Sequence, residues 1–343
     1  MKKSPSKRIG LIAMSGIRAQ NKELVELGLT LPGFIERSKV IASLPSLSLL
    51  TLAGMTPESF DVEYHEIQEY AEHGKLPDGF DLVAITSLSA QIFEAYKVAA
   101  HFRALGVPVV MGGLHVTAAP EEAMKHCDSI VIGEGENVWP ALLDDFSRGN
   151  LKPIYQARDH GEFDLATAPM PRFDLLDPEK YNRITVQTSR GCPHKCEFCA
   201  SSILLTPRYK LKPVEKVIAE IRAIKAIWPR PFIEFADDNS FVHKEHYKHL
   251  MRELAKEDIR WFTESDLAVA DDPELLALMR DAGCEQVLIG LESPRASSLS
   301  GIETAANWKA RRRDRYLGAI ERIQSQGITV NGCFILGLDG DTP

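Results

Sequence analysis

The feature that most constrains the fold is the alternation of short apolar runs with helical patterns, which occurs in two series along the chain. In the first series, runs typical of buried parallel strands lie at 8–14, 60–67, 81–86, 107–113 and 129–135. Helical patterns accompany them at 47–55, 90–106, 120–127 and 137–149. Strands that alternate with helices at this spacing predict a doubly wound parallel sheet, so we expect an α/β domain of the Rossmann-like type over residues 1–150.

A second series follows a connector, residues 151–180, whose Pro and Asp content is typical of an ordered linker. Its strands are expected at 183–189, 231–239, 260–270, 285–293 and 328–338, and its helices at 213–227, 244–256, 273–282 and 313–327. Five such repeats predict a (β/α) barrel, or part of one, over residues 181–343, whose chemistry would lie at the C-terminal strand ends. Because the chain stops just after the fifth strand, we expect the barrel to be C-terminally incomplete.

Charge and hydropathy exclude several classes of function. Forty-eight acidic residues against 40 basic ones leave a net charge of −8, which does not favour general binding of nucleic acid. No run approaches the ~20 apolar residues of a membrane span, and the apolar stretch 9–14 is too short for a signal peptide. We therefore expect a cytoplasmic protein, a compartment in which clustered cysteines more often hold a metal than form disulfides.

Three of the six cysteines lie in the stretch RGCPHKCEFCASS, residues 190–202, directly after the first strand of the second series. They are Cys192, Cys196 and Cys199. A structural zinc site needs four ligands, and His194 as the fourth would strain a tetrahedral site between Cys192 and Cys196. A four-iron cluster normally takes four thiolates, so three would leave one iron open to a ligand. Cysteines that merely pack are disfavoured because this loop is polar.

The pattern Cys-x3-Cys-x2-Cys, with the aromatic Phe198 before its last cysteine, resembles the radical S-adenosylmethionine superfamily over most of residues 181–343. The resemblance implies a [4Fe–4S] cluster on the three cysteines, with Phe198 beside the adenine of S-adenosylmethionine. It also implies a one-electron reductant, such as flavodoxin or ferredoxin. The reduced cluster would cleave S-adenosylmethionine to a 5′-deoxyadenosyl radical that abstracts hydrogen from an unactivated carbon.

The same resemblance assigns the ends of three later strands to S-adenosylmethionine, at Asp237, Asp238, Glu292, Ser293, Ile335 and Gly337. The two aspartates stand where the family more often has Gly-Gly-Glu, so binding of the methionine amine competes with helix capping by Asp238 or Asn239. Glu292 and Ser293 would hold the ribose hydroxyls or the methionine carboxylate, with turn formation as the alternative. The last two residues would pack on the adenine.

In the first domain, the expected carboxyl ends of the strands carry glycines and small hydroxyl side chains, as in TSLSAQ (86–91), GGLHVT (112–117) and GEGEN (133–137). Paired glycines let a flat ligand approach the backbone. This part of the chain resembles the cobalamin-binding domain that precedes the barrel in one large radical S-adenosylmethionine class. The resemblance implies cobalamin at Ser87, Ser89, Gly112, Gly113, Thr117, Gly133 and Gly135.

One departure concerns the lower ligand of cobalt. Many cobalamin domains carry Asp-x-His-x-x-Gly after the first strand, whereas residues 14–20 read MSGIRAQ. Cobalamin bound here would have no histidine ligand from this loop, and we expect His115 to be a loop residue rather than a cobalt ligand.

With both cofactors, the commonest chemistry of the family is methyl transfer to an unreactive centre, so we predict a radical S-adenosylmethionine methyltransferase acting on a small molecule, lipid or peptide. The alternatives are cobalamin-dependent radical cyclisation, rearrangement or oxidation, and a truncated cofactor-binding protein without turnover. Methylthiolation of transfer RNA would need a second cluster, but the first domain has only Cys127. The basic run 308–316 is expected to be a solvated helix face, with an acidic substrate as the alternative partner.

Overall fold

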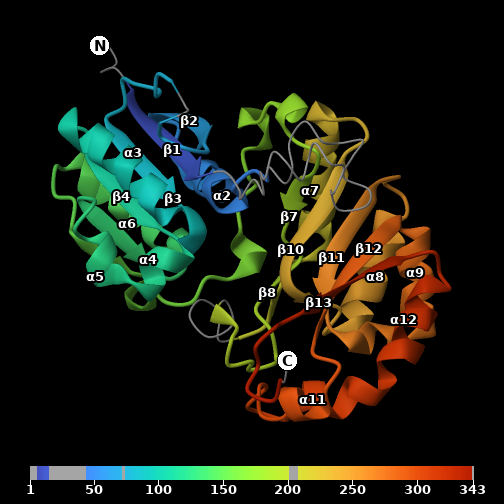
Figure 1. Ribbon diagram of the computed structural model, residues 1–343. Helices are drawn as coiled ribbons and strands as arrows, with labels where there is room; N and C mark the ends of the chain where they lie inside the picture. The colour runs from blue at the N-terminus through green and yellow to red at the C-terminus, as the bar shows by residue number, and fades with distance from the viewer. Residues whose placement is uncertain (1–5, 15–43, 72–73, 201–207, 342–343) are drawn as a thin grey trace. The chain divides into compact units, whose positions relative to one another are not determined.

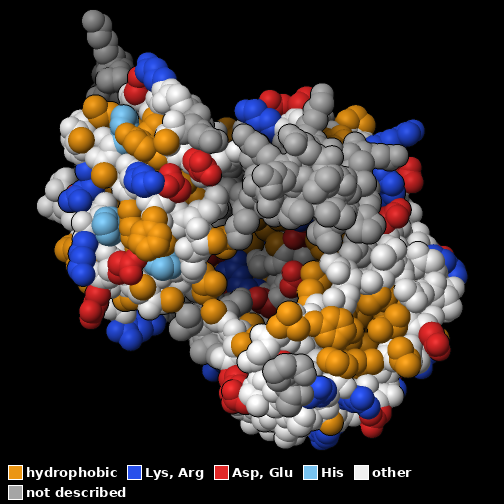
Figure 2. All heavy atoms as spheres, viewed as in Figure 1, with side chains coloured by type: hydrophobic (Ala, Val, Ile, Leu, Met, Phe, Trp, Pro, Cys, Tyr) orange, Lys and Arg blue, Asp and Glu red, His pale blue; other side chains and the backbone are white. Residues whose placement is uncertain are grey.

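The computed structural model describes residues 6–14, 44–71, 74–200 and 208–341. The chain divides into two compact units, Met1–Ile184 and Thr185–Pro343, each of which is described here by itself (Figure 1). Among the described residues, no helix has both the length and the apolar character to span a membrane. Acidic and basic side chains are intermixed on the visible face of each unit (Figure 2).

The first unit contains a six-stranded sheet with the order β2-β1-β3-β4-β5-β6. Its strands are β1 (Lys7–Met14), β2 (Phe60–Ile67), β3 (Leu82–Thr86), β4 (Val109–Gly112), β5 (Ser129–Ile132) and β6 (Ile154–Gln156). All five pairings are parallel. The strand order reverses between β1 and β3, so the switch point at which such sheets bind ligands lies beyond the carboxyl ends of these strands.

Helices cover both faces of this sheet, as the alternation of buried side chains requires. They are α2 (Leu47–Met55), α3 (Ile92–Ala104), α4 (Leu114–Ala118), α5 (Pro120–Ala123) and α6 (Gly135–Ser147). On β1, Ile12 packs in one core cluster with Phe102 of α3, whereas its neighbour Leu11 packs in a second cluster with Leu49 of α2 and Trp139 of α6. Burial on both faces explains why the strands read as continuous apolar runs.

The strands are shorter than the apolar runs where glycines turn the chain. The runs 107–113 and 129–135 predicted longer strands than β4 and β5, which end at Gly112 and Ile132. Gly113 and Gly133 follow with φ of 104° and 88°, values that favour glycine. The predicted connector 151–180 contains β6, which is one of the two edge strands of the sheet.

The second unit contains a five-stranded sheet with the order β13-β12-β11-β10-β7 and parallel registers from β10 to β13. The strands are β7 (Ile184–Val186), β10 (Phe232–Ser240), β11 (Arg260–Ser265), β12 (Cys284–Glu292) and β13 (Thr329–Phe334). The short strands β8 (Ser189–Arg190) and β9 (Lys210–Leu211) form an antiparallel pair beside it. The predicted α/β class, with a doubly wound sheet followed by a partial barrel, is confirmed.

The helices of this unit are α7 (Val214–Ile227), α8 (Lys244–Leu254), α9 (Pro273–Asp281), α10 (Ala296–Leu299), α11 (Trp308–Arg312) and α12 (Tyr316–Gln324). Figure 1 shows α8, α9 and α12 on the same side of the sheet. The core includes Phe235 of β10 stacked on Trp261 of β11, with ring centroids 4.7 Å apart. The strand expected at 260–270 ends at Ser265, because the Asp266 side chain caps a 3₁₀ turn by accepting a hydrogen bond from the backbone N–H of Ala268.

Candidate functional site

The three-cysteine loop follows β8 and is held by backbone pairing with a segment far along the chain. The N–H of Glu197 donates to the carbonyl of Ile302 at 3.0 Å, and the N–H of Thr304 donates to the carbonyl of Lys195 at 2.9 Å. Cys196, at the centre of this pairing, is buried, whereas Cys192 and Cys199 are half-buried. The loop that carries the thiols is therefore an ordered part of the fold.

The side chain of Glu303 stabilises this backbone pairing. Its buried carboxylate accepts backbone N–H groups from Lys195 at 3.2 Å, Ala305 at 2.9 Å, Ala306 at 2.8 Å and Trp308 at 3.0 Å. Burial alone would raise the pKa of this carboxyl, but these four donors outweigh it and lower the pKa to about 2. Glu303 is thus a fixed negative charge that joins the cysteine loop to the start of α11.

The end of β10 holds the loop from another side. Asp237 accepts the N–H groups of Thr188 at 2.7 Å and Ser189 at 2.9 Å, and the buried hydroxyl of Tyr247 at 3.1 Å. Asp238 accepts the N–H of Gly191 at 2.7 Å. Burial raises the pKa of Asp237, and its hydrogen bonds oppose that rise. Both predicted S-adenosylmethionine contacts therefore already serve to position residues 188–191, and their role toward the cofactor stays a prediction.

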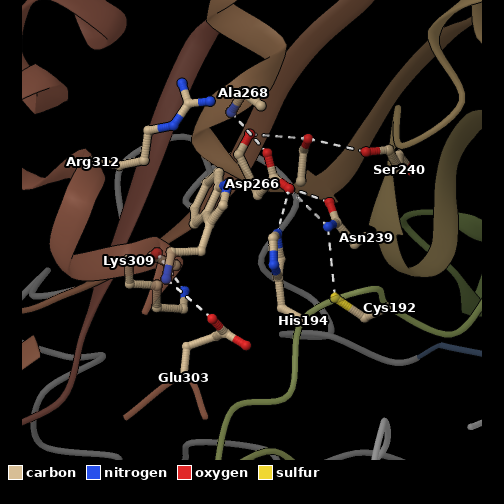
Figure 3. A network of polar contacts seen from close by, with 12 residues as sticks. Cys192, His194, Asn239, Ser240, Asp266, Ala268, Glu303, Lys309 and Arg312 are labelled. Atoms are coloured by element: carbon tan, nitrogen blue, oxygen red, sulfur yellow. Dashed lines mark hydrogen bonds and ion pairs between the residues drawn. The ribbon is translucent and has the colours of Figure 1, made fainter. Parts of the chain in front are cut away.

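The alternative of helix capping is wrong for Asp238 and Asn239. β10 runs on to Ser240, and α8 begins after His243, which makes no capping hydrogen bond through its side chain. Asn239 instead points its amide toward Cys192, with Nδ2 3.6 Å from Sγ (Figure 3).

A polar network extends from Cys192 through Asn239 to Asp266 and His194 (Figure 3). The Asp266 carboxylate accepts from Asn239 Nδ2 at 3.0 Å, from His194 Nε2 at 2.9 Å and from the N–H of Ala268 at 2.7 Å. Burial raises the pKa of Asp266, but these bonds outweigh it and hold the pKa below its usual range. His194, considered above as a zinc ligand, is therefore engaged with a carboxylate.

The thiols of the loop lie close enough for their charges to interact. Burial raises the pKa of Cys192, and burial together with the neighbouring Cys192 and Cys199 raises the pKa of Cys196 to about 12, although Lys309 acts in the opposite direction. Thiolates this close repel one another, and iron bound at the sulfurs would supply the compensating positive charge. Within the described ranges, no three His, Cys, Asp or Glu side chains converge on a single-ion site. In a [4Fe–4S] cluster each cysteine binds a different iron, so the three thiols do not need to meet at a single point.

Glu292 lies at the end of β12 in an unusual conformation and is paired. It has a φ of 63°, which is rare for a residue with a side chain. Its carboxylate accepts from Lys309 Nζ at 2.7 Å, and Lys309 also donates to the carbonyl of Gly290 at 2.9 Å. Both charged side chains are buried, so the prediction of a solvated face for the run 308–316 is wrong at Lys309.

The remaining residues assigned to S-adenosylmethionine differ in exposure. Ser293 is buried, and its hydroxyl accepts the N–H of Arg295 at 3.1 Å. Ile335 donates its N–H to the carbonyl of Glu292 at 2.8 Å, which ties β13 to β12. Gly337 is exposed with a φ of 91°, and Phe198 is 44% exposed. Both could face a ligand without displacing the core.

In the first unit, the residues assigned to cobalamin follow β3, β4 and β5. Thr117 accepts the N–H of Gly133 at 3.0 Å, which links the loops after β4 and β5. A Cβ atom at Gly113 would lie 2.9 Å from Thr86 Oγ1 at the end of β3, and the φ of 104° at Gly113 also favours glycine. The buried Ser87 donates to the carbonyl of Leu88 at 2.9 Å.

The remaining residues assigned to cobalamin also lie near the carboxyl ends of the strands. Ser89 is exposed after β3, Gly112 ends β4, and Gly135 begins α6. His115 was expected in a loop, but the structure places it in the short helix α4, with its Nε2 3.5 Å from Glu122 Oε1. Of the segment 14–20 used to assess a cobalt ligand, residues 15–20 lie outside the described residues.

Four site residues were not recognised as such from the sequence: Asn239, Asp266, Glu303 and Lys309. Each has at least one hydrogen-bond partner far along the chain, such as Lys195 for Glu303 and Cys192 for Asn239, and no local spacing signals such a pairing. The only available hint was the polar ending of two strand-like runs, FADDN at 235–239 and RWFTESD at 260–266.

Comparisons with known proteins agree with this geometry. The family model of the radical SAM superfamily matches residues 186–343, and that of the B12 binding domain matches residues 38–143. An uncharacterized methyltransferase of Pyrococcus horikoshii is 30% identical over 329 residues, covering 87% of this chain and 70% of that protein. Bacteriochlorophyllide d C-12(1)-methyltransferase of Chlorobaculum tepidum is 29% identical over 301 residues, covering 86% of this chain and 65% of that protein.

Among solved structures, the radical S-adenosylmethionine methyltransferase TsrM from Kitasatospora setae, with cobalamin and a [4Fe–4S] cluster bound, superposes with a TM-score of 0.72. The match covers 98% of this chain and 71% of TsrM at 17% identity, so it shows the shared fold. The present chain spans about two thirds of the bacteriochlorophyllide methyltransferase.

A partial barrel with three cysteines after its first strand defines a radical S-adenosylmethionine protein. The chain belongs to the radical SAM superfamily, in the class that carries a B12 binding domain ahead of the barrel. The predicted membership of the cobalamin-dependent radical S-adenosylmethionine class is confirmed. Membership of this class implies a [4Fe–4S] cluster, S-adenosylmethionine and cobalamin, so the three predicted cofactors are confirmed at the level of the family.

Proposed function

We propose that the chain is a cobalamin-dependent radical S-adenosylmethionine enzyme that transfers a methyl group to an unactivated carbon of a small-molecule, lipid or peptide substrate. The observation that carries the proposal is the cysteine loop itself, which the end of β10 and the segment 302–304 hold in place. The names of the similar methyltransferases support the same reaction.

The residues of this chain have distinct tasks in the proposed reaction. Cys192, Cys196 and Cys199 hold the cluster, and Phe198 covers the adenine. The buried pair of Glu292 and Lys309 fixes the turn after β12, at which the ribose and the methionine carboxylate would bind. When bound and reduced, the cluster supplies the electron that cleaves S-adenosylmethionine, and cobalamin supplies the methyl group.

The first domain, residues 1–150, would hold cobalamin at the loops after β3, β4 and β5, with residues 151–180 as the link to the barrel, residues 181–343. Gly113 and Gly133 support this assignment because their φ values of 104° and 88° turn the chain at the carboxyl ends of β4 and β5, the edge at which such sheets bind ligands. A flavodoxin or ferredoxin would deliver the electron, and a cytoplasmic location would provide both the reductant and reduced thiols.

The test begins with anaerobic reconstitution, after which iron, sulfide and cobalt are counted on one sample. We expect about four irons per chain with bound cobalamin, and release of 5′-deoxyadenosine after addition of reductant. The variant Cys196→Ala should lose the cluster absorption and the cleavage. Cys284→Ala, which removes a buried thiol of the same unit outside the loop, should retain both.

Cleavage by Cys196→Ala would refute the cluster assignment. Iron without cobalt, even after cobalamin is offered, would leave a radical enzyme whose first domain binds a different ligand. Cleavage of S-adenosylmethionine without methylation of any offered substrate would favour cyclisation, rearrangement or oxidation.

A further inference from the structure

The side-chain amide of Asn239 has an orientation that the surrounding hydrogen bonds determine. Its Oδ1 accepts the backbone N–H of Asp266 at 3.0 Å, and a backbone N–H can only donate. The opposite assignment would set the amide nitrogen against that N–H, so Nδ2 is the atom that faces Asp266 Oδ2 at 3.0 Å and Cys192 Sγ at 3.6 Å. Of the two hydrogens on Nδ2, one is directed at the carboxylate and one at the sulfur.

This amide is held firmly. Asn239 is 3% exposed, and Asp266 contacts it twice, through its backbone N–H and through its carboxylate. The carboxylate is itself fixed by His194 Nε2 at 2.9 Å and by the N–H of Ala268 at 2.7 Å (Figure 3). The His194 ring in turn packs on Trp308, with ring centroids 4.5 Å apart. Rotation of the amide away from Cys192 would break two hydrogen bonds in a buried site.

We propose that Asn239 sets the reduction potential of the cluster by donating an amide hydrogen to the sulfur of Cys192, with Asp266 and His194 as the residues that position the amide. This inference rests on the proposed function, because it requires a cluster ligated by Cys192. Hydrogen bonds to cluster sulfurs are one of the factors that set these potentials. Reduction adds negative charge that spreads onto the sulfurs, so a donor at Cys192 stabilises the reduced cluster and raises its potential.

The contact is specific to one of the three thiols. In the described residues, Cys192 is the cluster cysteine for which a side-chain hydrogen bond is seen. Lys309, a buried cation that acts electrostatically on Cys196, is already paired with Glu292 at 2.7 Å and donates to Gly290. The amide is therefore a directional neutral donor next to the cluster, and its removal changes the potential without removing a formal charge.

The experiment is a redox titration of the reconstituted full chain, in which electron paramagnetic resonance follows the reduced cluster. Asn239→Leu removes the donor at similar side-chain volume, which keeps water out of the vacated space. We expect about a tenfold fall in the ratio of reduced to oxidised cluster at a fixed potential, the size of one hydrogen bond to a charged group. For a one-electron couple this is a shift of about 59 mV to lower potential.

Asn239→Ala is the second variant, for the case that leucine disturbs folding, and should shift the potential in the same direction. The control is Ser265→Ala, which removes a buried hydroxyl that lies 3.2 Å from the backbone carbonyls of Ser240 and Asp266 and leaves the Asn239 amide and its two contacts with Asp266 in place. The control should keep the wild-type potential. Iron and sulfide counts on every sample separate this test from that of the proposed function.

A full cluster with an unchanged or higher potential in both Asn239 variants would overturn the inference. If neither variant holds iron while Ser265→Ala does, the amide is needed to assemble the site rather than to set its potential, which also overturns it. If wild type holds no cluster, the proposed function fails first, and this inference fails with it.

Discussion

The buried ion pair between Lys212 and Glu220 allows a sharp test of the energetics of the second unit. Lys212 Nζ lies 2.7 Å from Glu220 Oε1, and the two side chains are only 4% and 2% exposed. The pair joins the segment after β9 to α7, and the N–H of Lys212 also donates to the carbonyl of Thr188 at 2.9 Å, close to the start of the cysteine loop. We predict that Lys212→Met strongly destabilises this unit.

The magnitude follows from the environment of the carboxylate. Within the described residues, Glu220 Oε2 has no hydrogen-bond partner, so Lys212 is the main compensation for its charge. Burial raises the pKa of Glu220 even with the lysine present. Loss of one partner of a buried pair costs about 3–5 kcal/mol. Lys256→Met is the control, because Lys256 pairs with Glu253 at 2.7 Å on an exposed surface, where such a pair contributes about 1 kcal/mol or less.

The assay is urea denaturation of the apoprotein followed by circular dichroism. Lys212→Met should lower the free energy of unfolding by about 3–5 kcal/mol and the double variant Lys212→Met/Glu220→Leu should recover most of that loss, because an apolar pair carries no unpaired charge. The penalty should also shrink at low pH, at which the carboxyl is neutral. A loss no larger than that of the exposed control, or no recovery in the double variant, would refute the reasoning.

Two further predictions concern the sites, and a third concerns pH-dependent stability. Gly113→Val should weaken cobalamin binding several-fold in a ligand titration while the iron content stays unchanged, because valine disfavours a φ of 104°; loss of both cofactors would indicate unfolding. Lys309→Met leaves the Glu292 carboxylate without its buried partner and should weaken S-adenosylmethionine binding at least tenfold by equilibrium dialysis; unchanged affinity would contradict this. Partial desolvation and nearby carboxylates raise the pKa of Glu264 to about 7, but the side chain is exposed and solvent screens the effect. Its small contribution to stability is therefore fully present below about pH 4.5 and is lost as the pH rises through 7. Glu264→Gln should remove this decrease in the free energy of unfolding between about pH 4.5 and 7. If the variant keeps the wild-type pH profile, Glu264 does not cause the decrease.

Much of the fold could be predicted because the periodicity of apolar residues is a local property. The strand at 60–67 and the helix at 47–55 were expected with the bounds that the structure has. Errors occur where a single residue ends an element by its own conformation or hydrogen bond. Gly113 ends β4 early, and Asp266 ends β11 early, although the apolar runs continue in both cases.

The residues of the site also fall into those that a local sequence pattern predicts and those that it does not. The three cysteines, their spacing and Phe198 are adjacent along the chain, so the sequence by itself determined the cluster motif, the family and the likeness of the first domain to cobalamin-binding domains. It did not reveal that Asp237 and Asp238 position the backbone of the cysteine loop. Nor did it reveal that Lys309 of the basic run is buried against Glu292.

Only the tertiary structure decided these partners. A buried polar side chain must find a hydrogen-bond partner, and parallel strands bring together residues that are tens of positions apart in sequence. Asn239 and Cys192 meet only because β10 ends beside the cysteine loop, and neither residue carries a local signal of the other. Motifs that bind a cofactor can be read along one segment, whereas the contacts that orient and tune them depend on how the strands are arranged in space.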